Sequence, residues 1–299
     1  MTVSRKPEQT PLVSEHEDPL FWDCSEDEYH SDPESVSHSQ IETFDFDPSL
    51  FLLRHVVRKF PAKRTAALDL GSLVHRCVLR PGYWANNVVM VDPTALSASG
   101  QRRGKAWQEF CDEHAGKEVV TEEEFEKLSC ILDAIYAHDA ARQLRERIDR
   151  FEVPLRWVEP EHGLRLRCKF DGLFAGVVVD LKTTRDARPR QFTNSILQYG
   201  YHRQAAWYIR GYEAAFNAKP AFVFLAVTTA PPFRVSCYDL DATFLELGEM
   251  QNNELLGRLA ECYRTGQWHA KDHGQIITLT PPARAASEQW ELQDVSSDE

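Results

Sequence analysis

The sequence predicts a mixed α/β or α+β fold, in which one sheet is flanked by helices. Two observations support this class. Apolar residues recur at spacings of three and four in segments 68–79 and 121–147, as on the buried face of an amphipathic helix. Apolar and polar residues alternate over three later segments, which indicates strands. The resulting order of helices, three strands, a helix, two strands and a helix is typical of a sheet covered by helices.

The first half of the chain is predicted to be mainly helical. A short helix is expected after Ser35–Ser39, whose serines are suitable N-caps. The next helix spans 68–79 and stops at Pro81-Gly82, because this pair breaks helices. A basic loop runs into a helix within 99–114. The long helix 121–147 begins at a threonine cap followed by three glutamates, which suits the helix dipole.

The second half is predicted to hold all the strands. The first three are expected to form an antiparallel meander, because only short turns separate them. They cover 151–158, 164–173 and 176–182, with turns at 161–163 and 175–176. A helix over 192–216 ended by Pro220, strands over 220–229 and 233–240, and a helix over about 242–264 complete the prediction.

The acidity of the chain is concentrated at one end. The net charge is −12, but residues 1–46 hold twelve acids and two basic residues, which leaves 34 acids and 32 basic residues for the rest. We predict a disordered acidic extension over 1–26, because it has too little apolar surface to offset the entropy of ordering. A single domain is expected over 27–281, followed by a loose acidic tail over 282–299. The nearly balanced charge of the chain after residue 46 allows a local basic groove.

Several classes of site and location receive no support from the sequence. The seven cysteines include no Cys-x-x-Cys pair, so no disulfide framework, zinc knuckle or iron–sulfur cluster is expected. No phosphate-binding Gly-x-x-x-x-Gly-Lys loop occurs, so no nucleotide cofactor is expected and any ATP-driven motor is another chain. The chain has no apolar run of membrane-spanning length and no apolar signal core at its start, which predicts a cytoplasmic protein without a membrane partner.

The segment VVVDLKTTRD places an acid and a base at the end of an apolar strand. Asp180 and Lys182 project from the same face, because residues two apart in a strand share a face. Asp171 lies on the preceding strand, across a tight turn. Two neighbouring carboxylates repel each other, and a hard divalent cation such as Mg²⁺ removes that conflict. A salt bridge at a strand end is the simpler alternative.

Three polar residues of the following helix share a side. Gln204 and Tyr208 are four residues apart, and Tyr201 precedes Gln204 by three. His75 lies on the amphipathic helix 68–79, where Gly71 permits a close approach of the backbone. Ordinary helix polarity is the alternative for all four residues.

Together these motifs resemble the PD-(D/E)XK nuclease superfamily, in the branch of RecB-type nuclease domains and RecE-like phage exonucleases. The resemblance rests on five segments in the family's order, which cover about residues 29–240. They are LGSLVHRCVLRPGYW, GKAWQEF, RCKFDGL, VVVDLKTTRDA and YHRQAAWYIRGY. It implies a restriction-endonuclease-like core.

The resemblance also implies a role for each matching residue. Metal ligands would be His75, Asp171, Asp180 and the Leu181 carbonyl. Lys182 would be the catalytic lysine, and Gln204 and Tyr208 the pair that shapes the site. Glu152 is a candidate outer-sphere or second-metal acid, with a solvated strand-end glutamate as the equal alternative. Candidate phosphate-binding residues, or else solvated surface charges, are Arg102, Arg103, Lys105, Arg185, Arg188 and Arg190.

The activity implied is an exodeoxyribonuclease of phage or bacterial origin that uses Mg²⁺, with Mn²⁺ as a substitute, and no ATP. It would degrade linear duplex DNA 5′ to 3′ and leave a 3′ single strand for an annealing protein, acting as a homo-oligomeric ring. The alternatives are a Cas4-like or AddB-like nuclease, an endonuclease, or a non-catalytic DNA-binding relative. A methyltransferase reading of LDLGS fails because the second glycine of that motif is missing.

Overall fold

The computed structural model describes residues 21–60, 66–80, 82–270, 274 and 276–280. Its main sheet has the strand order β1-β5-β6-β7-β8, and β4 pairs with β5. The strands are β1 (Val36–Ser37), β4 (Arg150–Val158), β5 (Arg165–Phe174), β6 (Val177–Thr184), β7 (Ala221–Thr228) and β8 (Val235–Asp239). The antiparallel meander β4-β5-β6 is confirmed, β7 runs parallel to β6, and β8 is antiparallel to β7.

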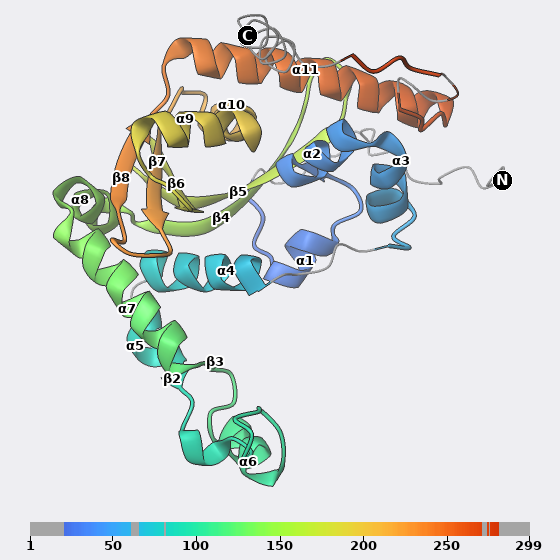
Figure 1. Cartoon of the computed structure of the whole chain (residues 1–299). Coiled ribbons are helices and arrows are strands. Elements are labelled where there is room, and N and C mark those ends of the chain that lie inside the picture. Colours follow the sequence, from blue (N-terminus) through green and yellow to red (C-terminus); the bar gives the residue numbers. More distant parts are fainter. Residues whose placement is uncertain (1–20, 61–65, 81, 271–273, 275, 281–299) are drawn as a thin grey trace, which may run out of the picture.

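Helices cover both faces of the sheet (Figure 1). One face packs against α2 (His38–Phe46), α9 (Pro189–Gln198), α10 (Tyr201–Phe216) and α11 (Ala242–Thr265). The other packs against α4 (Ala66–Leu79), α7 (Glu122–Ala137) and α8 (Asp139–Arg147). Successive residues of β6 divide between the two cores: Val178 belongs to the first, and Val179 and Leu181 to the second.

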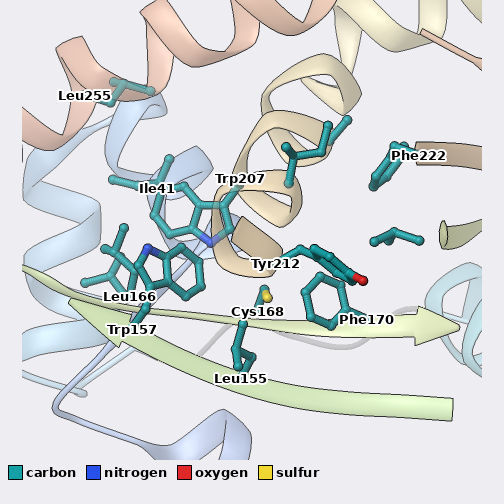
Figure 2. Close-up of a cluster of buried hydrophobic side chains, with 14 of the residues drawn as sticks. Ile41, Leu155, Trp157, Leu166, Cys168, Phe170, Trp207, Tyr212, Phe222 and Leu255 are labelled. Atoms are coloured by element: carbon teal, nitrogen blue, oxygen red, sulfur yellow. The ribbon is translucent and has the colours of Figure 1, made fainter. Parts of the chain in front are cut away.

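The larger core lies between α10 and the strands β4 and β5. Figure 2 shows Trp207 of α10 beside Trp157 of β4, with Phe170 of β5 and Tyr212 of α10 next to each other. The Trp207 indole donates to the Arg167 carbonyl at 3.0 Å, so even its polar atom is satisfied. This packing makes β5 and α10 a rigid support for the residues at their ends.

A smaller part of the chain projects from this body (Figure 1). It contains α5 (Tyr83–Asn87), the parallel pair β2 (Val88–Met90) and β3 (Glu118–Val120), the short helix η2 (Pro93–Ala95) and α6 (Lys105–Glu113). We call residues 83–120 the projecting module. Its helix α6 stacks Trp107 on Phe110, and Phe110 on His114, along one side.

Residues 21–26 contact β4, although the sequence predicts disorder over 1–26. Phe21 forms a bridge to Leu155 of β4, and the Trp22 amide donates to the Pro154 carbonyl at 3.3 Å. The helix α1 (Glu26–Ser31) follows, and then β1 pairs with β5. The predicted boundary at residue 26 is therefore wrong for residues 21–26, because two aromatic side chains attach them to β4. Residues 1–20 of the predicted extension, and the tail 282–299, lie outside the described residues.

Two predicted helices are each split in two. The segment 121–147 breaks at His138, whose imidazole accepts from the Ala141 amide and caps α8. The segment 192–216 breaks at Gly200, which adopts a left-handed conformation between α9 and α10. The helix α10 ends at Phe216, as predicted, and a left-handed Asn217 rather than Pro220 terminates it. The helices α3 (Pro48–Phe51) and η1 (Leu52–Val56) follow α2 and were not predicted.

None of the helices in the described ranges is long and apolar enough to cross a membrane.

Candidate active site

The two candidate carboxylates lie where β5 and β6 separate. Gly172 and Val179 are the last paired residues, and their register makes Asp171 and Asp180 the next pair across the gap. Beyond it the Leu181 amide leaves the ladder and donates to Asp171 Oδ2 at 2.9 Å. The strand separation therefore holds Asp171 against β6 and opens a space between the two strands.

Asp180 and Lys182 form an ion pair beside α10. The Asp180 side chain is 1% exposed and that of Lys182 14%. The Lys182 ammonium lies 4.9 Å from the centre of the Tyr201 ring and 5.8 Å from that of Phe224, as a cation over aromatic faces. The shared face predicted for Asp180 and Lys182 is confirmed, and the contact of Lys182 with Tyr201 was not predicted.

The two carboxylates differ in their protonation behaviour. Burial and the negative charge of Asp171 raise the pKa of Asp180 to about 6, although Lys182 opposes this. Burial also acts to raise the pKa of Asp171, but the charge and hydrogen bond of His75 outweigh it and the net pKa falls. Burial and Asp171 thus disfavour ionisation of Asp180 even beside Lys182, and a cation placed between the carboxylates would relieve this effect.

His75 reaches this junction from α4. A Cβ at Gly71 would lie 3.3 Å from Thr183 Oγ1, so α4 and β6 approach closely one turn before His75. His75 Nδ1 lies 3.3 Å from Asp171 Oδ2, and the His75 side chain is 28% exposed. Burial lowers the pKa of His75, but the attraction of Asp171 is stronger, so the net pKa is raised. The close approach predicted from Gly71 is confirmed.

Gln204 and Tyr208 extend the site along α10. Gln204 Nε2 donates to the Tyr208 hydroxyl at 3.1 Å, which confirms that they share a face. The Tyr208 ring packs edge-on against Phe170 at 5.7 Å. Burial and the charge of Asp180 raise the pKa of Tyr208 well above its usual range, so the phenol stays neutral and available as a donor.

Glu152 lies opposite Asp171 on β4 but faces a different partner. The β4–β5 register skips this position, and Glu152 has a positive φ of 46°. Its carboxylate forms an ion pair with Arg80, directly after α4. In the metal-free protein Glu152 is therefore neither a free solvated glutamate nor directed at Asp180.

A match to a family model shows which protein family the chain belongs to. The model of a PDDEXK-like domain of unknown function (DUF3799) matches residues 37–277. The chain belongs to this family. The match spans α2 to the end of the described chain and includes every site residue above. Membership places the chain in the PD-(D/E)XK nuclease superfamily and supports a nuclease.

Solved structures agree on the fold. A protein from Eubacterium rectale, described as a "Putative exonuclease", has a TM-score of 0.54 and 14% identity. The match covers 92% of this chain and 98% of that one, and at this identity it shows the fold alone. LHK-Exo in complex with dAMP matches 54% of this chain and 84% of its own, with 13% identity and a TM-score of 0.25, too low to indicate a common fold. No curated protein sequence matches.

The predicted phosphate-binding residues fall into two groups in this PDDEXK-like domain. Arg185, Arg188 and Arg190 are exposed just after β6, and Arg188 pairs with Asp186 at 2.5 Å. Arg102, Arg103 and Lys105 lie at the start of α6, at the far end of the projecting module (Figure 1). The expectation that this second group lies near the site is wrong, because the module carries it away from the sheet.

The junction fits a hard divalent cation by its donor chemistry. Asp171 and Asp180 supply carboxylate oxygens, the ligands that Mg²⁺ prefers, and His75 adds an imidazole nitrogen. The raised pKa of Asp180 is the observation that favours such an ion. Within the described ranges no group of three or more His, Cys, Asp or Glu side chains is arranged to hold a metal ion, so His75, Asp171 and Asp180 do not form a complete ligand set. An open site of two carboxylates, completed by water and phosphate oxygens, is the arrangement typical of Mg²⁺.

Two contributions to the site were not predicted from sequence. The Leu181 amide orients Asp171, and a main-chain donor leaves no side-chain signal. Arg80 holds Glu152 across 72 residues of chain, a contact that no local pattern indicates.

Proposed function

We propose that this protein is a metal-dependent, ATP-independent exodeoxyribonuclease. The observation that carries the proposal is the convergence of Asp171, Asp180 and Lys182 where β5 and β6 separate. Phosphodiester hydrolysis requires stabilisation of negative charge on phosphorus oxygens and activation of a water. A pair of carboxylates beside an ammonium group is suited to both requirements.

The acidic residues would hold the ion. Asp171 and Asp180 would coordinate Mg²⁺, or Mn²⁺ in its place, with His75 and the Leu181 carbonyl as further ligands. Such an ion lowers the pKa of a bound water and neutralises charge on the phosphate. The Leu181 amide keeps Asp171 facing β6, so this carboxylate is orientated before any ion binds.

Lys182 and the residues of α10 would act on the substrate. Burial lowers the pKa of Lys182, but Asp180 and Asp171 reverse this and keep the group charged. The ammonium can then orient the attacking water or donate to the phosphate oxygen as its charge develops. Gln204 and Tyr208, linked by their hydrogen bond, provide neutral donors for a neighbouring phosphate.

Two resemblances support the proposed substrate class. We take linear duplex DNA as the substrate, because the sequence motifs resemble RecE-like exonucleases and the Eubacterium rectale protein of the same fold is described as a "Putative exonuclease". A 5′ to 3′ polarity, a ring-shaped homo-oligomer and delivery of a 3′ strand to an annealing protein belong to the same proposal.

One assay tests the activity and its mode together. Linear duplexes labelled at the 5′ or the 3′ end and a covalently closed circle are incubated with the protein, with Mg²⁺ or with EDTA. Exonuclease action predicts mononucleotides from linear DNA with Mg²⁺, an intact circle and no product with EDTA. Early release of the 5′ label supports the proposed polarity. A cleaved circle would indicate an endonuclease, and no cleavage of any substrate would contradict the proposal.

A further inference from the structure

The outer face of β4 and β5 carries a row of basic side chains that ends at the candidate site. Leu166, Cys168 and Phe170 point into the larger core, so the alternate residues of β5 point the other way. Those residues are Arg165, Arg167, Lys169 and then Asp171. The candidate metal ligand is therefore the next member of a row of three cations on one strand.

The neighbouring strand widens this row. Arg156 of β4 is the register partner of Arg167, and Leu155 and Trp157 on either side of it point into the core. Arg150 is exposed further along the same strand, but Phe151 packs in the smaller core and Val153 in the larger, so the alternation does not extend to it. We call Arg156, Arg165 and Lys169 the basic strip. Arg167 is 1% exposed and is treated separately, because its guanidinium is buried.

An acidic segment covers the basic strip. Residues 21–34, FWDCSEDEYHSDPE, contain six acids and no lysine or arginine. Glu26 forms an ion pair with Lys169, and Glu34 pairs with Arg165 at 3.0 Å. The ring of Trp22 lies 4.3 Å from the Arg156 guanidinium, and that of Phe21 lies 4.6 Å from Arg150. Each cation of the strip thus has a partner from this one segment. Figure 1 shows α1, within this segment, on the same side of the sheet as α4.

The segment is anchored near its middle by Tyr29, and the two carboxylates that cover the strip lie on either side of this anchor. Tyr29 is 7% exposed and its ring lies 5.3 Å from the buried Arg167 guanidinium, which also contacts Ser35 and Asp32. By contrast Glu26 and Glu34 are 58% and 54% exposed. In each pair the carboxylate is the exposed partner, whereas Lys169 and Arg165 are 18% and 14% exposed, so a competing anion can replace a carboxylate that already faces solvent. The covering carboxylates can therefore leave the strip while the Tyr29 anchor stays in place.

Protection of a sheet edge does not account for these carboxylates. An edge strand such as β4 is shielded by backbone pairing and apolar contact, which Phe21 and Trp22 supply. The carboxylates lie on cations two and six residues before Asp171, where a phosphate backbone leading to the site would bind. Asp23, Asp27 and Glu28 are exposed beside them and would repel that backbone.

We propose that the basic strip is a DNA phosphate-binding surface leading to Asp171, and that residues 21–34 are its built-in competitor. This inference rests on the proposed function, because it takes DNA as the polyanion. DNA and the acidic segment bind the strip in turn, so DNA must displace Glu26 and Glu34. The acidic segment lowers the affinity for DNA and restricts access to the site.

The test measures DNA binding without cleavage. A fluorescent linear duplex is titrated with the full chain in EDTA, as wild type and as the Glu26→Gln/Glu34→Gln variant. Two freed phosphate contacts should tighten binding about tenfold near physiological salt and steepen the salt dependence of log K by about 2. The matched control is Glu126→Gln/Glu246→Gln, which changes the net charge equally at exposed helix positions.

A double-mutant cycle identifies the cation involved. Lys169→Gln should weaken binding about threefold relative to Glu26→Gln, and Glu26→Gln should have no effect once Lys169 is replaced. Hydrogen exchange gives a second readout: the Trp22 amide should exchange faster when DNA is bound.

The outcomes separate this inference from the proposed function. If Glu26→Gln/Glu34→Gln binds DNA no more tightly than the control, or if no variant binds DNA, the strip is not a DNA surface. If the variants bind DNA in the predicted pattern but the protein cleaves no DNA with any divalent metal, the basic strip is supported as a DNA-binding surface and the proposed nuclease activity is contradicted.

Discussion

The β5–β6 junction and the projecting module both contain residues that the sequence predicts to be functional. These residues are largely buried and in mutual contact at the junction, whereas they are solvent-exposed in the module. At the junction, Asp171, Asp180 and Lys182 each contact another group of the site and are 15%, 1% and 14% exposed. In the module, Lys105 is 89% exposed and its ion pair with Glu109 spans one helical turn. Chemistry that depends on geometry is built on rigid strands, whereas charge that only attracts a polyanion tolerates a solvated surface.

The largest expected effect lies at the junction. Asp180→Asn and Lys182→Met should each reduce the rate of DNA cleavage roughly a thousandfold, because the first removes a ligand of the proposed ion and the second a charge that acts on the reacting phosphate. Initial rates on an end-labelled linear duplex measure this. Asp149→Asn, an exposed position on the loop before β4, should keep the wild-type rate. Wild-type activity in Asp180→Asn would exclude the site.

The raised pKa of Asp180 predicts a pH-dependent cost to folding. Its value is 3.8 unfolded and about 6 folded, so at pH 5 the folded state keeps a proton that the unfolded state has lost. This contribution to stability is complete below pH 3.8 and disappears as pH rises through 6, a change of about 3 kcal/mol. Denaturant unfolding of the metal-free protein from pH 4 to 7 should show that slope, and Asp180→Asn should flatten it. Parallel curves for the two proteins would contradict the assignment.

A smaller effect is expected for the histidine of α4. His75→Gln should weaken metal binding about 10- to 100-fold, because it removes a ligand and the partner of Asp171. Excess Mn²⁺ should then restore much of the cleavage rate. His114→Gln, which alters a ring stacked on Phe110 in the projecting module, is the matched control. If His75→Gln and His114→Gln weakened metal binding equally, His75 would have no special role in binding the metal ion.

The smallest effect is expected in the projecting module. Replacing Arg102, Arg103 and Lys105 with glutamine should weaken duplex binding by up to about tenfold and leave kcat unchanged, since these groups lie far from the junction. Steady-state kinetics at two salt concentrations distinguish a change in DNA binding from a change in kcat. A fall in kcat comparable to that of Lys182→Met would show that the module reaches the reacting bond.

The sequence predicted well what depends on neighbours in the chain. The strand pleat places Asp180 beside Lys182, and a short hairpin places Asp171 opposite, so these relations follow from spacing alone. The strands β1, β2 and β3 were not predicted, because two or three residues show no periodicity and their pairing is non-local. The break at Gly200 was not predicted because the helical apolar pattern continues through it.

The partners of the site residues were less predictable than the residues themselves. Nothing in the sequence indicates that Arg80 holds Glu152, or that the Leu181 amide holds Asp171. The opposite error occurred for Arg102, Arg103 and Lys105, whose composition suggests phosphate binding but whose distance from the sheet no local pattern reveals. Local patterns determine which groups face one another along a strand, and only tertiary packing determines which of them meet.

We propose that the β5–β6 junction binds the metal ion of a nuclease. The most direct test of this proposal is a titration of the wild-type protein, Asp171→Asn and Asp180→Asn with Mn²⁺, followed by the paramagnetic resonance signal of the free ion. We predict saturable binding to the wild type and at least a tenfold increase in Kd in each variant. Binding of equal affinity in all three proteins would place the ion elsewhere and contradict the account.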